Sequence, residues 1–477
     1  MVSVSRESLK PFFEPRVVAI IGASDKPGKV GNTILINFLW GNFKGEVYPV
    51  NPKYNLLLEK RCYASVKDVP KPVDLAVIAV PASLVSKVME ECAEKHVKAA
   101  IIISGGFKET GPDGARLEKE VAAIARRGNI RVIGPNCIGV YNPETNVDTM
   151  FLPEEKLRRP PRGSIALLSQ SGAFMGTMLD WAAYEGLGIS KAVSYGNECD
   201  VDLIDLIEFL ADDPSTRVIA VYVEGIEHGQ KFIRVVKKAT TKKPVIAIKS
   251  GRSTRGKAAV LSHTGSLAGE DVLYSMAFKQ TGVLRAEDFE EMLDLAKAFA
   301  LQPPATGDRV LIITDGGGAG VMAVDACEHY GLNVPELDPK LQEELKQYFP
   351  PYCSTHNPID LTGDTDNQRY RIALEKAFLN YGGVDSALVI LLVQAPSLTV
   401  DVVDIVRDIN NKSTRPMVAC CMGGEYSAKV AKEVERRGIP SYPTPERAVR
   451  AIWALTKYGQ WKLREIRGNN RFHENLN

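Results

Sequence analysis

The amino-acid sequence predicts an α/β fold made of three doubly wound parallel-sheet domains. Short β-branched runs alternate with helical patterns almost to the end of the chain, which favours parallel sheets covered by helices. Two proline-rich segments interrupt this alternation, at residues 152–162 and 303–308. The length of 477 residues suits about three domains of ordinary size. We therefore expect domains at residues 1–150, 163–302 and 308–465.

The composition excludes several classes of protein. Lysine and arginine total 59 against 58 acidic residues, so the net charge of +1 offers no excess field for nucleic acid or a membrane surface. No apolar run approaches the ~20 residues that span a bilayer, and residues 1–13 lack a signal-peptide core. The eight cysteines form no CxxC pair. We expect no metal site, no disulfide framework, no membrane segment and a reducing, cytoplasmic location.

The first domain is predicted to hold a five-stranded sheet. Its strands are expected at residues 17–22, 46–50, 74–80, 99–104 and 131–134, with the clearest helices at 84–95 and 114–127. In such a sheet, ligands bind at the carboxyl ends of the strands. The loops that follow these strands are therefore the candidate ligand site.

A glycine-rich turn follows the first strand and leads into a helix at residues 32–40. This arrangement, Gly22 to Gly31, is typical of pyrophosphate binding by backbone N–H groups, although a tight turn without a ligand would also use glycines. The second strand ends near Lys53, where enzymes of nicotinamide dinucleotide carry an acid. A lysine there favours an extra phosphate, as on coenzyme A or the phosphorylated dinucleotide. The candidate binding residues are Gly22, Ala23, Ser24, Pro27, Gly28, Lys29, Val30, Asn51, Pro52, Lys53, Val80, Pro81, Ser104, Gly105, Asn136 and Cys137.

Two further glycine-rich turns open helices in the later domains. The strand at residues 164–168 leads into Gln170, Ser171, Gly172 and Ala173; the strand at 310–313 leads into Gly317, Gly318, Ala319 and Gly320. Each turn would leave unpaired N–H donors and about half a positive charge at a helix end. Each could also reflect close packing alone. Two such turns in one chain predict donors that converge on one phosphoryl group.

A single histidine lies between these two turns in the sequence. His263 follows a strand at residues 244–248, and we expect it on a flexible loop, where an imidazole can attack phosphorus. Glu224 ends the strand at 218–223 and could accept the Nδ1–H of His263. The alternatives are a histidine on a solvated loop and an ordinary surface acid.

The third domain is expected to continue with strands at residues 386–393 and 417–421 and a closing helix at 445–463. The polar tail from Gly468 is expected to be loose. The turn at residues 357–360 either lines a cleft or is a capped turn, and the sequence does not choose between them.

Taken in order, these motifs resemble a known family. The sequence resembles the nucleoside-diphosphate-forming acyl-CoA synthetases, in particular the α subunits of ADP-forming acetyl-CoA synthetases. The motifs that carry the resemblance are Gly22–Ser24 with Pro27–Gly31, Gly134–Asn136, Ser169–Gly172, Glu224–Gly225 and Ser262–Ser266. These are relatives of succinyl-CoA synthetase. The resemblance covers nearly the whole chain.

The resemblance implies a ligase that converts acyl-CoA, ADP and phosphate into acid, ATP and coenzyme A. It implies a Rossmann-like domain that binds coenzyme A, followed by two flavodoxin-like domains. It also implies that His263 is phosphorylated, that Glu224 contacts it, and that Gln170–Ala173 and Gly317–Gly320 are the helix ends that hold phosphate.

The resemblance further implies a partner. Family members use an ATP-grasp domain to hold ADP and Mg²⁺, and we find none in this sequence. A separate β subunit in an α2β2 assembly is therefore expected, with small carboxylic acids as substrates. Two alternatives stay open: an oxidoreductase that uses the phosphorylated dinucleotide, and a non-catalytic regulatory subunit that binds acyl-CoA.

Overall fold

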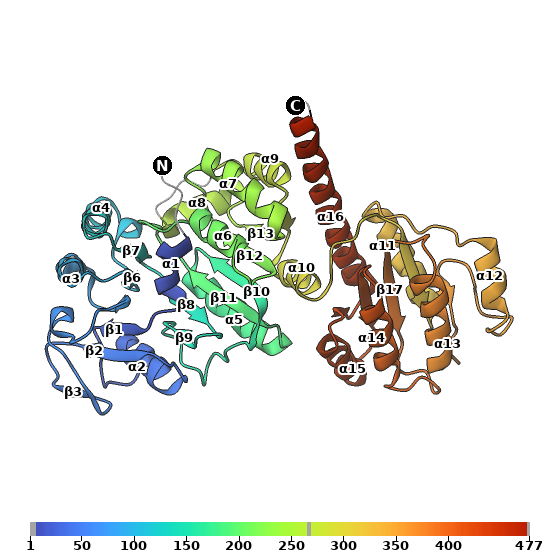
Figure 1. The fold of residues 1–477 in the computed structure, drawn as a ribbon, viewed down its shortest axis with the longest axis horizontal. Coiled ribbons are helices and arrows are strands. Elements are labelled where there is room, and N and C mark those ends of the chain that lie inside the picture. The colour runs from blue at the N-terminus through green and yellow to red at the C-terminus, as the bar shows by residue number, and fades with distance from the viewer. Residues whose placement is uncertain (1–5, 265–268, 475–477) are drawn as a thin grey trace. The chain divides into compact units, whose positions relative to one another are not determined.

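The computed structural model describes the backbone of residues 6–264 and 269–474, and all of their side chains except those of residues 6, 261–264 and 468–474. The chain divides into two compact units, Met1–Glu287 and Asp288–Asn477, and each is described by itself. Parallel sheets with helices against them make up both units, so the predicted α/β class is confirmed (Figure 1).

The first sheet has the strand order β2-β1-β5-β6-β7, and all of its pairings are parallel. Its strands are β1 (Val17–Ile21), β2 (Glu46–Val50), β5 (Leu75–Ile78), β6 (Ala99–Ile102) and β7 (Arg131–Ile133), as predicted to within a few residues. The helices that belong to it are α1 (Arg6–Phe13), α2 (Val30–Trp40), α3 (Ala82–Glu94) and α4 (Pro112–Arg127), with 3-10 turns at Val66–Asp68 and Lys108–Thr110.

Alternate residues of β1 face two different layers of helices. Val18 and Ile20 share a buried cluster with residues of α1 and α2, whereas Ala19 and Ile21 share another with residues of α3 and α4. Because every residue of β1 is buried, both faces of the sheet are covered. This double cover leaves the strand ends as the accessible part of the sheet, and it is there that the binding loops lie.

The second sheet has the order β14-β13-β12-β10-β11-β8-β9. Its parallel strands are β10 (Arg162–Ser169), β11 (Ile189–Ser194), β12 (Val218–Val223), β13 (Val245–Lys249) and β14 (Leu284–Ala286). The antiparallel strands β8 (Gly139–Asn142) and β9 (Val147–Asp148) extend it. Because β8 pairs with β11, residues that follow the first sheet directly belong to the second, and the two sheets form one unit.

The helices of this part are α5 (Gly172–Glu185), α6 (Leu203–Ala211), α7 (Gly229–Lys242), α8 (Thr254–Thr264) and α9 (Asp271–Thr281). The expectation of a flexible loop around His263 is wrong for its first half, because α8 is a helix that includes His263. The run Gly256-Lys257-Ala258-Ala259-Val260-Leu261 contains good helix formers, and these outweigh its glycine. Residues 265–268 lie outside the described part of the chain.

The second unit holds the third sheet, with the order β16-β15-β17-β18-β19. Its strands are β15 (Val310–Thr314), β16 (Ile359–Asp360), β17 (Ser386–Leu391), β18 (Met417–Cys421) and β19 (Ser441–Tyr442). Its helices are α10 (Phe289–Leu301), α11 (Gly317–His329), α12 (Pro339–Lys346), α13 (Asn367–Ala373), α14 (Val402–Lys412), α15 (Glu425–Arg436) and α16 (Pro445–Glu474), with a π-helical stretch at Leu374–Leu379.

Two features of the second unit differ from the expectation. The helix α16 continues to Glu474, so the tail from Gly468 is not loose up to that residue. In addition, α10 packs against α16: Arg447 donates hydrogen bonds from Nε and Nη2 to the two carboxylate oxygens of Asp294, each at 2.8 Å. The helix α10 precedes the proline-rich segment yet belongs to the second unit.

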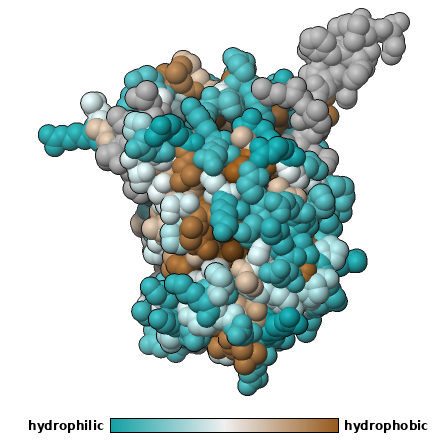
Figure 2. Space-filling model, turned by 90° about the vertical axis from the view of Figure 1, so that its left-hand side faces the viewer, coloured by the Kyte–Doolittle hydropathy of each residue, from teal (hydrophilic) through white to brown (hydrophobic). Residues whose placement is uncertain are grey.

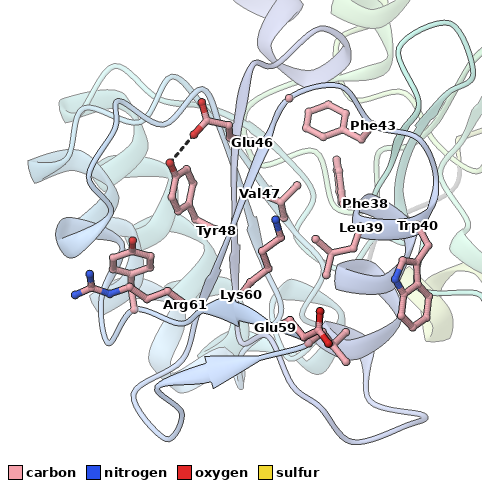
Figure 3. A pocket seen from close by; sticks show the side chains of 13 residues that line it. Phe38, Leu39, Trp40, Phe43, Glu46, Val47, Tyr48, Glu59, Lys60 and Arg61 are labelled. Carbon is pink, nitrogen blue, oxygen red and sulfur yellow. Dashed lines mark hydrogen bonds between the residues drawn. The ribbon is translucent and has the colours of Figure 1, made fainter.

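A short antiparallel hairpin, β3 (Leu56–Leu57) with β4 (Lys60–Arg61), projects beside the outer strand β2. A groove of about 610 Å³ lies between this hairpin, β2 and the end of α2, with Phe43 and Trp40 on its wall and a hydrogen bond of 2.6 Å from Tyr48 to Glu46 (Figure 3). From this side of the molecule the surface is mainly hydrophilic, with apolar residues gathered along its middle and at its lower end (Figure 2). None of the predicted binding residues lines this groove.

Candidate functional site

The predicted binding loops of the first sheet lie together at the carboxyl ends of its strands. Asn51 donates from Nδ2 to the carbonyl of Ala23 at 2.8 Å, which joins the loops after β1 and β2. Ser104 donates from Oγ to the carbonyl of Val80, and the N–H of Asn136 donates to the carbonyl of Ser104 at 2.9 Å. Hydrogen bonds therefore link the loop after β2 to that after β1, and the loops after β5, β6 and β7 to one another.

The turn after β1 needs glycine at two positions. At Gly22 the φ angle is +92°, and a Cβ would lie 2.4 Å from the carbonyl oxygen of Ala79. At Gly31 a Cβ would lie 2.0 Å from the carbonyl oxygen of Gly22, so α2 touches the turn directly. Since Lys29 caps α2 without a side-chain hydrogen bond, the first N–H groups of the helix face the exposed turn. This geometry suits a phosphate.

Lys53 and Cys137 differ in what they can offer a ligand. Lys53 is exposed, so its ammonium is accessible to a ligand, and its backbone N–H donates to Oδ1 of Asn51 at 3.0 Å. The thiol of Cys137 donates to the carbonyl of Ile102 at 3.4 Å, and burial raises the pKa of this thiol to about 12. Cys137 can therefore contribute its backbone to a site but not a thiolate.

The helix α5 begins in the way that the sequence predicts. Ser171 is the N-cap: its Oγ accepts from the N–H of Phe174 at 3.3 Å, and its carbonyl accepts from the N–H of Met175 at 3.1 Å. The N–H groups of Gly172 and Ala173 have no acceptor among the residues that the structure describes. These two donors, at the positive end of a helix, are suited to hold an anion.

Gln170 connects α5 to Glu224. Its Oε1 accepts from the N–H of Glu224 at 2.9 Å and from the N–H of Gly225 at 3.1 Å. The side chain of Glu224 is buried, and the hydroxyl of Tyr222 donates to its Oε1 at 3.3 Å. Two of the predicted site residues are thereby fixed relative to one another, at the carboxyl ends of β10 and β12.

Glu198 is a site residue that the sequence did not reveal. It follows β11 with a φ angle of +58°, a conformation that few residues other than glycine adopt. Its carboxylate accepts from the N–H of Leu203 at 2.9 Å and from Nε2 of Gln170 at 3.3 Å. Burial raises the pKa of Glu198 to about 8. A neutral acid thus supports Gln170 near neutral pH.

A cavity of about 240 Å³ opens in front of the donors of α5. The loops of the first sheet contribute Ile103, Lys108, Asn136, Cys137 and Ile138. The segments around the second sheet contribute Phe151, Gln170, Ser171, Gly172, Ala173, Gly196 and Asn197. The predicted coenzyme A loops after β6 and β7 therefore meet the predicted phosphate-binding turn in one hollow.

A polar network holds the walls of this cavity together. Lys108 donates from Nζ to the carbonyl of Asn197 at 2.6 Å, and Asn197 donates from Nδ2 to Glu118 at 2.8 Å and to Glu109 at 2.7 Å. Asn136 donates to Oδ1 of Asn197 at 3.3 Å. Every one of these bonds joins the first sheet to the loop after β11. Nothing local in the sequence signals these contacts of Asn197, because its partners lie far away along the chain.

The side chain of His263 lies outside the described residues, so its predicted contact with Glu224 stays a prediction. The helix that carries it, α8, lies beside the turn Lys108–Thr110, and Lys108 lines the cavity. Lys249, at the end of β13, precedes this helix. Its ammonium donates to the carbonyl of Ser250 and lies 4.6 Å from the ring centre of Tyr274, and burial lowers its pKa.

In the second unit, α11 begins with the predicted turn. Gly316 is the N-cap, and its carbonyl accepts from the N–H groups of Ala319 at 3.0 Å and Gly320 at 3.2 Å. A Cβ on Gly317 would lie 2.8 Å from Oδ2 of Asp360, so a carboxylate stands near this helix end. Burial raises the pKa of the neighbouring Asp315. Asn357 donates to the carbonyls of Val310 and Pro335, so it supports the fold and does not line a cleft on its own.

Two further expectations concern the whole chain. Within the described ranges, no helix is both long and apolar enough to cross a bilayer. Over the same residues, no three His, Cys, Asp or Glu side chains are grouped so that they could hold a metal ion.

Comparisons with known protein families match almost the entire chain. Residues 16–143 match the CoA binding domain, residues 162–299 the succinyl-CoA ligase like flavodoxin domain, and residues 310–464 the ligase-CoA domain.

Individual relatives match over similar lengths. The α subunit of acetate–CoA ligase (ADP-forming) I from Pyrococcus furiosus is 42% identical over 96% of this chain and 99% of that subunit. The acetate–CoA ligase (ADP-forming) I of Archaeoglobus fulgidus is also 42% identical, but this chain spans only 64% of its length. Among solved structures, dinucleotide forming acetyl-coenzyme A synthetase 1 of Ca. Korarchaeum cryptofilum, in complex with phosphate and ADP, is 36% identical, with a TM-score of 0.90 over 97% of this chain and 99% of that one.

Proposed function

The chain belongs to the family of ADP-forming acyl-CoA synthetases, and from this premise we propose that it is the α subunit of an ADP-forming acetyl-CoA synthetase. It would convert acyl-CoA, ADP and phosphate reversibly into the free acid, ATP and coenzyme A. The observation that carries this proposal is the cavity in which the predicted coenzyme A loops meet the N-terminus of α5.

The first step joins phosphate to the acyl group. With coenzyme A on the loops after β1 and β2, its thioester reaches the cavity along the loops after β6 and β7. A phosphate oxygen attacks the thioester carbonyl, the carbon–sulfur bond breaks, and the thiolate of coenzyme A leaves. The N–H groups of Gly172 and Ala173 point toward the negative charge that develops on oxygen, and in a site closed to water such donors lower the barrier most.

The second step moves the phosphoryl group to His263. The imidazole attacks phosphorus and the carboxylic acid leaves. Glu224 would accept the Nδ1–H, which keeps Nε2 as the nucleophile. The burial of Glu224 and its fixed backbone support this role, because a base that orients a tautomer must itself be held. The phosphohistidine then passes its phosphoryl group to ADP.

The last transfer requires a partner. We propose a β subunit with an ATP-grasp domain that holds ADP and Mg²⁺, in an α2β2 assembly. The relatives support this division, since one is named as an α subunit that this chain matches over 99% of its length, and another is a single longer chain. All eight cysteines are free, which fits the cytoplasmic location that we propose.

Labelling of the chain by radioactive phosphate in the presence of acetyl-CoA tests the proposal. The wild-type protein should acquire a label that is stable in base and labile in acid, as phosphohistidine is, and His263→Ala should remove it. His329→Ala, at an exposed histidine of α11, is the matched control and should keep the label. A label that persists in His263→Ala would overturn the assignment. Coenzyme A binding without any label would favour a regulatory subunit, and binding of the phosphorylated dinucleotide in its place would favour an oxidoreductase.

A further inference from the structure

Three apolar side chains form the apolar part of the cavity wall in front of α5. Ile103 follows β6, Ile138 lies between β7 and β8, and Phe151 follows β9. Gly172 and Ala173, with their N–H donors, line the same cavity. A reacting acyl group needs both kinds of contact, donors for its carbonyl oxygen and apolar contact for its hydrocarbon part. The cavity therefore offers what an acyl group needs.

The apolar wall is held in place on both sides. A Cβ on Gly172 would lie 2.7 Å from Cγ2 of Ile138, so the isoleucine covers the first residue of α5. Arg159 holds the loop of Phe151: it donates to Asp148 at 2.7 Å and to the carbonyl of Leu152 at 2.8 Å. Packing of Ile138 against α5 and the hydrogen bonds of Arg159 thus restrict the segments that line this part of the hollow.

The volume of the cavity limits what it can hold. At roughly 30 Å³ for each non-hydrogen atom, the share of one water molecule, a volume of about 240 Å³ holds about eight atoms. Acetyl phosphate has that many. An aromatic acyl phosphate has nearly twice as many atoms, and Phe151 is the largest side chain of the lining that it would meet.

The charge of the residues that line the cavity also affects which acyl groups can bind. Of the described residues that line the cavity, Lys108 is the only charged one. Its ammonium is already engaged, with the Asn197 carbonyl at 2.6 Å, Glu227 at 3.5 Å and Glu118 at 3.9 Å. A second carboxylate on the acyl group would thus be buried without a partner, at considerable cost.

We propose that Ile103, Ile138 and Phe151 determine the acyl specificity of the site and restrict it to short, uncharged acyl groups. This inference rests on the proposed function, because it takes the cavity as the place where the thioester reacts. It assigns to these three residues a role that neither the glycine-rich turns nor His263 could reveal.

Arsenolysis tests the inference on the full chain without a partner subunit. Arsenate replaces phosphate in the first step, and the acyl arsenate hydrolyses in water, so the loss of thioester absorbance reports that step alone. We expect the wild-type protein to cleave acetyl-CoA at least about tenfold faster, by kcat/KM, than phenylacetyl-CoA or succinyl-CoA. Phe151→Ala should reduce the preference for acetyl over phenylacetyl by about tenfold or more and leave the rejection of succinyl-CoA intact.

The matched control is Phe43→Ala, which removes the same ring from the separate groove beside β2 and should leave all ratios unchanged. If Phe151→Ala does not fold, Ile138→Val provides the second variant and should admit butyryl-CoA better than the wild-type protein does. Equal cleavage of acetyl- and phenylacetyl-CoA by the wild-type protein, or an unchanged ratio in either folded variant, would overturn the inference. Absence of arsenate-dependent cleavage with every acyl-CoA would instead overturn the proposed function.

Discussion

Replacing Glu198 with glutamine is expected to change how the stability of the chain depends on pH. Burial raises the pKa of this carboxyl from the ordinary 4.5 to about 8. Between these values the unfolded chain carries a carboxylate while the folded chain carries a neutral acid, so the folded state binds more protons and loses stability as the pH rises. Below this range the side chain contributes no pH dependence, and above it the loss grows no further.

The magnitude follows from the two pKa values. At about 1.4 kcal/mol per pH unit, the difference corresponds to at most about 5 kcal/mol. Because Glu198 keeps part of its surface in solvent, we expect about half of that, or roughly 2 kcal/mol. For a unit of this size, that free energy shifts the melting temperature by about 4 °C.

Melting temperatures of the wild-type protein and Glu198→Gln, measured at about pH 5.5 and about pH 8.5, provide the assay. The introduced glutamine has only one side-chain oxygen, so it loses one of the two hydrogen bonds that Glu198 accepts, from Gln170 or from Leu203. This loss shifts the melting temperature by the same amount, a constant offset, at both pH values. The informative quantity is the change in that offset, about 4 °C in favour of the variant at high pH.

Lys108, Asp202 and Glu227 also face Glu198. Glu155→Gln, at an exposed carboxylate of the same unit that is not one of these groups, is the control and should show no such change. Parallel curves for the wild-type protein and Glu198→Gln would refute the reasoning.

Two further predictions concern the proposed reaction. Glu224→Gln should slow phosphorylation of His263 by at least about tenfold and leave coenzyme A affinity unchanged, because a neutral amide does not stabilise the positive charge that the imidazole gains as it attacks phosphorus. Rapid-quench labelling measures the rate, and an unaltered rate would remove Glu224 from the mechanism. Lys53→Ala should weaken coenzyme A binding by about two- to fivefold in calorimetry, the range for an exposed ion pair. Its affinity for dephospho-coenzyme A should stay the same, and an equal loss for both ligands would contradict a role in binding the extra phosphate.

The parts of the fold that local sequence specifies were predicted well. All five strands of the first sheet were expected close to their observed bounds, because buried parallel strands are continuous β-branched runs between turn residues. The turns at Gly22–Gly31 and Gln170–Ala173 were found for a similar reason. Their glycines are required by steric contacts in the turn, and their N-cap serine is required by a hydrogen bond to a residue three positions away.

The parts that depend on distant contacts were missed. Strand β8 joins the second sheet only because β11 offers it an edge, and nothing within Gly139–Asn142 indicates this. Glu198 reads as an ordinary surface acid until Gln170 and the N-terminus of α6 surround it. In α8, the glycines at either end suggested a loop, while the alanines between them decided the outcome.

In the first unit, the residues proposed to form the acyl phosphate and the helix proposed to carry the phosphoryl group away belong to different parts of the structure. The motifs for coenzyme A and for phosphate lie on two different sheets, yet Asn197 ties them together through Asn136, Glu109, Glu118 and Lys108. Strand β8 reinforces this connection, because it leaves the first sheet and pairs in the second. An attack by phosphate on a thioester requires reacting atoms within about 3–3.5 Å, and a joint that flexed would lose that alignment. In the proposed reaction, the formation of the acyl phosphate would therefore depend on this joint between two domains, whereas the phosphoryl group would leave on a separate helix, α8, which meets that joint beside Lys108–Thr110.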